Sequence, residues 1–156
     1  MTTKDILFGW MLQQIDKPYE WGGTGWPGYD CSGLVQDFDE IIGIDPSGDQ
    51  TAAELHNYWW NQIIKRKAEN LQKNVITFGT HLFFSSQYDR DHVTHVAIAV
   101  NKTIMFEAGG GNRHCKTPDD AEEQNARVRF RRIDSRKDFL CAIRPYQFAN
   151  AIMEGS

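Results

Sequence analysis

The sequence changes character abruptly at residue 30. Residues 18–29 contain four glycines and two prolines, which favour turns and interrupt regular helices and strands. From Leu34 to Ile42 the apolar residues recur at intervals of three and four, which is the spacing of one helix face. We therefore predict a pocket-forming loop that leads into a helix, with Asp30 as its N-cap and Gly43 at its end. The loop is also rich in aromatic residues: Tyr19, Trp21, Trp26 and Tyr29.

This helix would carry Cys31 in its first turn. The unpaired N–H groups and the positive end of the helix dipole favour a thiolate there. A cysteine at such a position can have its pKa drawn down from about 8.5 to about 3.5–7.5. The same N–H groups can also hold an oxyanion that forms on a carbonyl under attack. Cys31 is therefore a candidate nucleophile, and a small buried core residue is the alternative interpretation.

The overall composition is that of a globular protein. At 156 residues the chain is long enough for a core, and we predict one domain over residues 1–156. The net charge of −4 gives no reason to expect a nucleic acid partner. No segment approaches the length of a membrane span, and the N-terminus lacks the pattern of a secretory signal.

The three cysteines, at positions 31, 115 and 141, are too few and too widely spaced for a disulfide framework or a Cys-x-x-Cys metal site. We expect Cys115 to be exposed in a polar loop and Cys141 to be an inert residue of a buried strand. His92 and His95 lie three residues apart, but on a strand or loop they point differently, and no ligand cluster joins them. We therefore predict no metal site.

The order of the elements predicts an α+β fold, with N-terminal helices packed on a central antiparallel sheet. An amphipathic helix is expected over residues 2–15, and Thr51 with Glu54 forms a capping box for another helix. Strand patterns follow, and we expect the arginines that alternate over 127–133 to lie on an exposed face. The expected strands are 80–84, 94–100, 103–108, 127–133 and 139–144, and 112–126 is expected to be a loop.

A cysteine nucleophile needs a base, and His95 is the best of the five histidines because it begins a strong strand pattern. A histidine at a strand edge with only a structural role is the alternative. Glu107 could orient the imidazole if residues 94–100 and 103–108 form a hairpin. A two-residue turn at 101–102, however, would place Glu107 on the opposite face of the sheet from His95, unless the turn is longer or a bulge intervenes.

Three sequence blocks together resemble the NlpC/P60 family of cysteine peptidases. They are Pro-Tyr-Glu-Trp-Gly-Gly at 18–23, Asp-Cys-Ser-Gly-Leu-Val at 30–35 and Thr-His-Val-Ala-Ile-Ala-Val at 94–100. The resemblance implies a papain-like fold and hydrolysis of amide bonds in peptidoglycan stem peptides, often between D-glutamate and a diamino acid. It also implies Cys31 as nucleophile and His95 as base.

The resemblance places the third polar residue of the family at Glu107, where His, Asn or Gln is usual. It aligns Tyr19 with a tyrosine that lines the site, and it places His81 where an aspartate is usual. The N–H groups around Cys31, within Asp30-Cys31-Ser32, would hold the oxyanion. We expect aromatic groove walls from Trp21, Trp26 and Tyr29, and further substrate contacts from His92 and residues 109–114.

The sequence thus predicts a monomeric cysteine endopeptidase that needs no cofactor and acts on the peptide of peptidoglycan. A phage lysin, a tail-associated enzyme or an injected effector would fit, so the protein would be cytoplasmic until release, virion-associated or delivered to the cell wall. One alternative is a non-catalytic binding or tail-assembly module on the same fold. The other is an amidase or acyltransferase that acts on a non-wall substrate.

Overall fold

Side-chain caps begin the first three helices in the computed structural model, which describes residues 1–149. Helix α1 (Thr3–Gln14) begins with a capping box between Thr2 and Asp5, and α3 (Ala52–Ile64) begins with one between Thr51 and Glu54. In α2 (Cys31–Glu40) the Asp30 carboxylate caps the first turn. These helices begin within a residue of their predicted starts.

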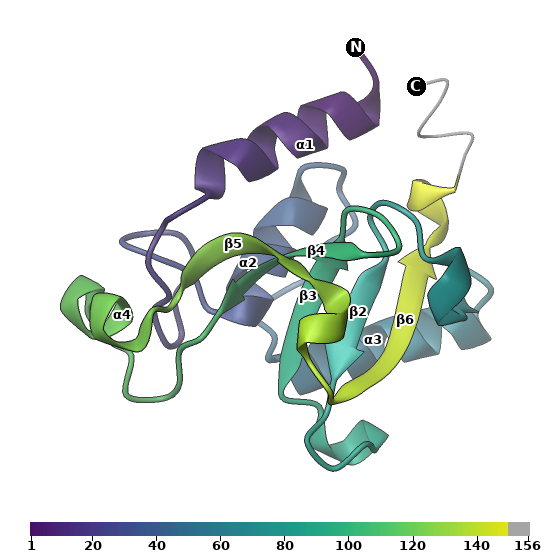
Figure 1. Ribbon diagram of the computed structural model, residues 1–156. Coiled ribbons are helices and arrows are strands. Elements are labelled where there is room, and N and C mark those ends of the chain that lie inside the picture. The colour runs from purple at the N-terminus through teal and green to yellow at the C-terminus, as the bar shows by residue number, and fades with distance from the viewer. Residues whose placement is uncertain (150–156) are drawn as a thin grey trace.

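Six strands form one antiparallel sheet in the order β1-β6-β2-β3-β4-β5. The sheet and the preceding helices confirm the predicted α+β fold (Figure 1). A short helix, α4 (Pro118–Gln124), lies inside the segment that was expected to be a loop. The strands are β1 (Ala68–Leu71), β2 (His81–Phe84), β3 (His95–Ala99), β4 (Ile104–Gly109), β5 (Arg127–Arg132) and β6 (Phe139–Pro145).

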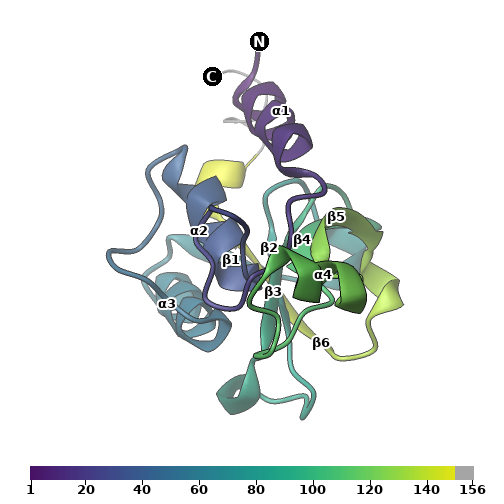
Figure 2. The same ribbon diagram turned by 90° about the vertical axis from the view of Figure 1, so that its left-hand side faces the viewer.

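The main hydrophobic core lies between the helices and one face of the sheet. Figure 2 shows α2 and α3 together on the same side of the strands. Phe38 of α2 is fully buried and packs against Trp10 and Phe148. A second apolar cluster, which includes Leu82 and Ala97, covers the other face of the sheet. The N-terminus of α2 is therefore held rigidly against the strands.

The hairpin between β3 and β4 differs from the predicted one by one residue. Its partners are Ile98 with Phe106 and Ala99 with Met105. The turn is longer than two residues because the Asn101 side chain accepts hydrogen bonds from the backbone N–H groups of Thr103 and Ile104. In this register His95 and Glu107 lie on the same face of the sheet. The two-residue turn was therefore the wrong prediction, and the longer turn removes the conflict.

Candidate active site

The loop before α2 is closed by the carboxylate of Asp30. It accepts hydrogen bonds from Gly33 N at 2.7 Å, from Gly22 N at 3.1 Å and from Ser32 Oγ at 3.2 Å. Gly33 is needed because a Cβ there would lie 2.2 Å from the carbonyl oxygen of Gly23. Asp30 thus joins the glycine-rich loop to the start of the helix and fixes the position of Cys31.

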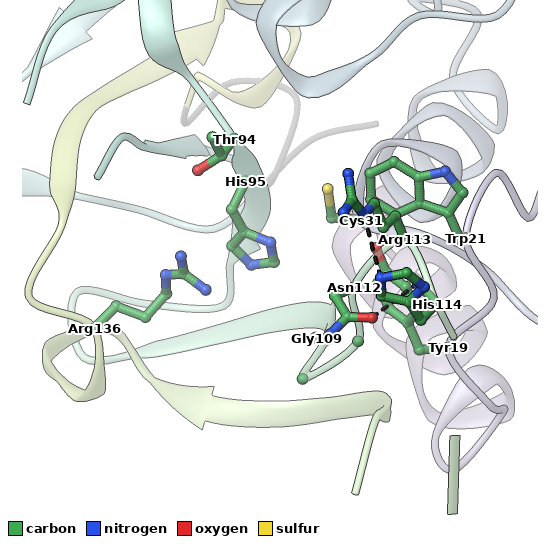
Figure 3. A pocket seen from close by; sticks show the side chains of 12 residues that line it. Tyr19, Trp21, Cys31, Thr94, His95, Gly109, Asn112, Arg113, His114 and Arg136 are labelled. Carbon is green, nitrogen blue, oxygen red and sulfur yellow. Dashed lines mark hydrogen bonds between the residues drawn. The ribbon is translucent and has the colours of Figure 1, made fainter. Parts of the chain in front are cut away.

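Cys31 is the first residue of α2 and faces a cleft of about 490 Å³. Figure 3 shows Tyr19, Trp21 and Cys31 on one side of this cleft and His95 with Thr94 across from them. Residues 109–114 and Arg136 complete the lining. The structure therefore brings Cys31, His95, Tyr19 and Trp21 to one cavity.

His95 stands at the start of β3 and is buried. Its Nε2 lies 2.9 Å from Oε1 of Glu107, and its ring packs against Phe84. Burial lowers the pKa of His95, but hydrogen bonding and negative charge from Cys31 and Glu107 outweigh this effect and raise the pKa to about 9. The imidazolium is therefore strongly stabilised between these two groups.

Glu107 lies on β4 and is completely buried, yet its carboxyl group is ionised. Burial alone would raise its pKa, but hydrogen bonds and charges from His95 and Arg129 lower the pKa to about 2. Nε of Arg129 donates to Oε2 at 3.1 Å, and Nη1 of Arg131 lies 3.6 Å from the same oxygen. The prediction of an exposed arginine face was wrong here, because β5 pairs Arg129 directly with Glu107.

These contacts decide which ring nitrogen of His95 carries a proton. An ionised carboxylate can only accept hydrogen bonds, so Nε2 of His95 must carry a proton and donate a hydrogen bond to Glu107. The other nitrogen, Nδ1, is then the atom that can exchange a proton with a partner in the cleft. The arrangement Arg129–Glu107–His95 therefore presents a histidine in one defined tautomer.

Loop 109–115 is anchored to the segment that carries Tyr19. The thiol of Cys115 donates to the carbonyl oxygen of Tyr19 at 3.3 Å, and Trp21 N donates to the carbonyl oxygen of Cys115 at 2.7 Å. A Cβ on Gly111 would lie 2.1 Å from the Tyr19 ring. Cys115 is fully buried, so the expectation that it is exposed was wrong. It helps to hold one rim of the cleft.

Several residues with an expected site role lie elsewhere. Trp26 is 90% exposed and does not line the cleft, and Tyr29 is buried with its hydroxyl on Asp37. His81 is fully buried and bound to Asp39 at 2.7 Å, whereas His92 pairs with Asp89 at the surface. The Ser32 side chain bonds Asp30. Cys141 is only partly buried, and burial raises its pKa to about 12.

Residues 1–149 contain neither a metal-binding cluster nor a membrane-spanning helix. No group of three or more His, Cys, Asp or Glu side chains in this range could hold a metal ion. No helix in the same range is long and apolar enough to cross a membrane.

Comparison with known proteins identifies the family. Residues 16–132 match the NlpC/P60 family, so the chain belongs to it. It is 33% identical over 98 residues to the bifunctional muramidase/DL-endopeptidase CwlT of Bacillus subtilis, covering 62% of this chain and 26% of the relative. It is 30% identical over 100 residues to the murein DD-endopeptidase MepH of Escherichia coli, covering 63% and 33% respectively. The chain thus spans only a quarter to a third of these relatives.

Solved structures share the fold. A NlpC/P60 family protein from Bacillus cereus superposes with a TM-score of 0.65 at 18% identity, over 92% of this chain and 40% of that chain. RipD from Mycobacterium tuberculosis, described as a non-catalytic NlpC/p60 domain protein adapted to peptidoglycan binding, gives a TM-score of 0.61 at 15% identity over 92% and 96%. At this level of identity the likeness concerns the fold alone.

Proposed function

We propose that this protein is a cysteine endopeptidase that hydrolyses an amide bond in peptidoglycan stem peptides, between D-glutamate and a diamino acid, and acts as a monomer. The observation that carries the proposal is the cleft in which Cys31, at a helix N-terminus, faces His95 with its defined tautomer. The endopeptidase names of CwlT and MepH support the substrate class.

In the proposed reaction, Nδ1 of His95 takes the thiol proton of Cys31, or already holds it in an ion pair with the thiolate, and Sγ attacks the scissile carbonyl carbon. The tetrahedral intermediate then collapses to a thioester, and the same proton moves to the leaving amine. Water attacks the thioester with His95 as base, which releases the acid product and restores the thiol. Glu107 keeps His95 oriented and stabilises the imidazolium.

Two sources of hydrogen bonds suit the oxyanion. The backbone N–H groups of Cys31 and Ser32 belong to the first turn of α2, where a helix offers them no acceptor. Burial raises the pKa of Tyr19, so its phenol stays protonated and can donate. Asp30 supports the site indirectly, because its carboxylate is used to cap α2.

The test is digestion of purified peptidoglycan by the wild-type protein and by Cys31→Ala, followed by mass spectrometry of the soluble fragments. We expect new stem-peptide fragments from the wild type only, and their masses identify the bond. Failure of the wild type to release fragments across a pH series would contradict the proposal and favour a peptide-binding module. Cleavage of a non-wall amide alone would favour an amidase.

A further inference from the structure

Within residues 1–149, the lining of the cleft carries positive charge and no carboxylate. The whole chain has 21 acidic and 17 basic residues and a net charge of −4. Yet among the described residues that line the cleft there is no Asp or Glu, while Arg113, Arg136 and His95 are present. A cleft lined with one sign of charge concentrates ligands of the opposite sign. This local contrast indicates an anionic ligand.

The two arginines lie at different ends of the cleft. Figure 3 shows Arg136 on the side of His95 and Arg113 on the side of Cys31 and Trp21. Arg136 already donates through Nε and Nη2 to the Asp138 carboxylate, at 3.0 and 2.7 Å, so its charge is partly neutralised. Arg113 donates through Nε to Nε2 of His114 at 3.2 Å, which leaves its Nη groups for a ligand.

The turn that carries Arg113 is held in place before any ligand arrives. Oδ1 of Asn112 accepts from His114 N at 2.8 Å, and the Asn112 carbonyl oxygen accepts from Cys115 N at 2.9 Å. Cys115 is in turn bonded to Tyr19. A guanidinium that is carried by a fixed turn loses less conformational entropy when it binds a ligand, and this favours specific recognition.

We propose that Arg113 selects substrates with a free carboxylate on the residue that supplies the scissile carbonyl, and discriminates against the carboxamide. The assignment to this residue rests on the proposed function, because His95 must face the leaving amine and Arg113 lies at the other end. A glutamate that is linked through its side chain keeps its α-carboxylate free at this position. An arginine has only donors, so it binds a carboxylate through charge-assisted hydrogen bonds, whereas a carboxamide offers one neutral oxygen.

The experiment uses two synthetic stem peptides that differ only in a carboxylate or a carboxamide at that residue. Both the affinity for the Cys31→Ala protein, by calorimetry, and kcat/KM of the active protein are measured. We expect about a ten- to hundredfold preference for the carboxylate peptide, from the usual strength of hydrogen bonds to charged groups. With Arg113→Gln the preference should fall to within about threefold.

Arg132→Gln is the matched control, because Arg132 is an exposed arginine paired with Asp134 outside the cleft. This variant should keep the full preference. Equal affinity of the two peptides for the Cys31→Ala protein, or a preference that Arg113→Gln leaves unchanged, would overturn the inference. The binding arm reads the preference without turnover, so a protein that binds selectively but cleaves neither peptide would contradict the proposed hydrolysis and support the selection by Arg113.

Discussion

Glu107→Gln should inactivate the protein because of the arginine behind it. Arg129 can only donate, so the single oxygen of the introduced amide would turn toward its guanidinium. The amide NH₂ would then face Nε2 of His95, which must become an acceptor. The proton of a neutral His95 would move to Nδ1, where it blocks transfer from Cys31. A glutamine at this position is thus incompatible with Arg129.

The size of the effect follows from two contributions. Turning the amide back toward His95 breaks a hydrogen bond to a charged group, which costs about 1.5–3 kcal/mol, or roughly ten- to a hundredfold in rate. The carboxylate also contributes to raising the pKa of His95 from 6.5 to about 9. Loss of that share removes about another tenfold or more of imidazolium stabilisation. We therefore expect kcat/KM of Glu107→Gln to fall by about 10²–10⁴.

The assay compares kcat/KM on a stem peptide for Glu107→Gln, Arg129→Gln and the double variant, with circular dichroism to confirm folding. In the double variant the new side chain at position 129 can accept as well as donate, so the amide at position 107 can present its oxygen to His95. We expect the double variant to be about ten- to a hundredfold more active than Glu107→Gln alone. A folded double variant that is no more active, or a Glu107→Gln protein with near wild-type activity, would refute this reasoning.

Three further predictions concern stability and position. Asp30→Ala should lower the free energy of unfolding in urea by about 1 kcal/mol and should also lower kcat/KM. The control Thr51→Ala, which removes the cap of α3, should lower the free energy of unfolding by a similar amount and leave the activity unchanged. Equal losses of activity in the two variants would contradict a positioning role for Asp30. Asp39→Ala should destabilise the protein by about 3–5 kcal/mol because it leaves His81 buried without the carboxylate that it contacts. The double variant Asp39→Leu/His81→Leu should be destabilised less. If the double variant were the less stable of the two, a stabilising role of the buried His81–Asp39 contact would be contradicted. Because the folded-state pKa of His95 is raised, its contribution to stability is complete below pH 6.5 and is lost as the pH rises through about 9. Wild type and His95→Ala should therefore differ more in unfolding free energy at pH 6 than at about pH 9.5, and a constant difference would contradict the raised pKa.

The sequence predicted the helices well because their signals are local. The caps at Thr2, Asp30 and Thr51 and the apolar spacing behind them depend on neighbouring residues only. The same kind of signal was available for α4, where Thr117 and Asp120 form a capping box and Pro118 occupies the first turn. This segment was nevertheless expected to be a loop, because it is highly charged and has no apolar face. Only Ala121 of the helix is buried.

The surroundings of Glu107 could not be predicted because they depend on pairing between strands. The position of Glu107 relative to His95 depends on a turn whose length is set by the Asn101 side chain. The Arg129 contact depends on the β4–β5 register. An alternating arginine strand is the same pattern whether it faces solvent or a buried carboxylate, and only the partner strand decides. Cys115 was misjudged similarly, since its partner Tyr19 is 96 residues away in sequence.

The most direct test of the account is to trap the acyl-enzyme. The protein is mixed with a stem peptide, quenched in acid within milliseconds to seconds, and its intact mass is measured before the modified residue is mapped. We predict a transient mass increase equal to the acyl portion of the peptide, located on Cys31 and released by hydroxylamine as expected of a thioester. Turnover with no adduct on Cys31, together with an active Cys31→Ala protein, would contradict the central claim.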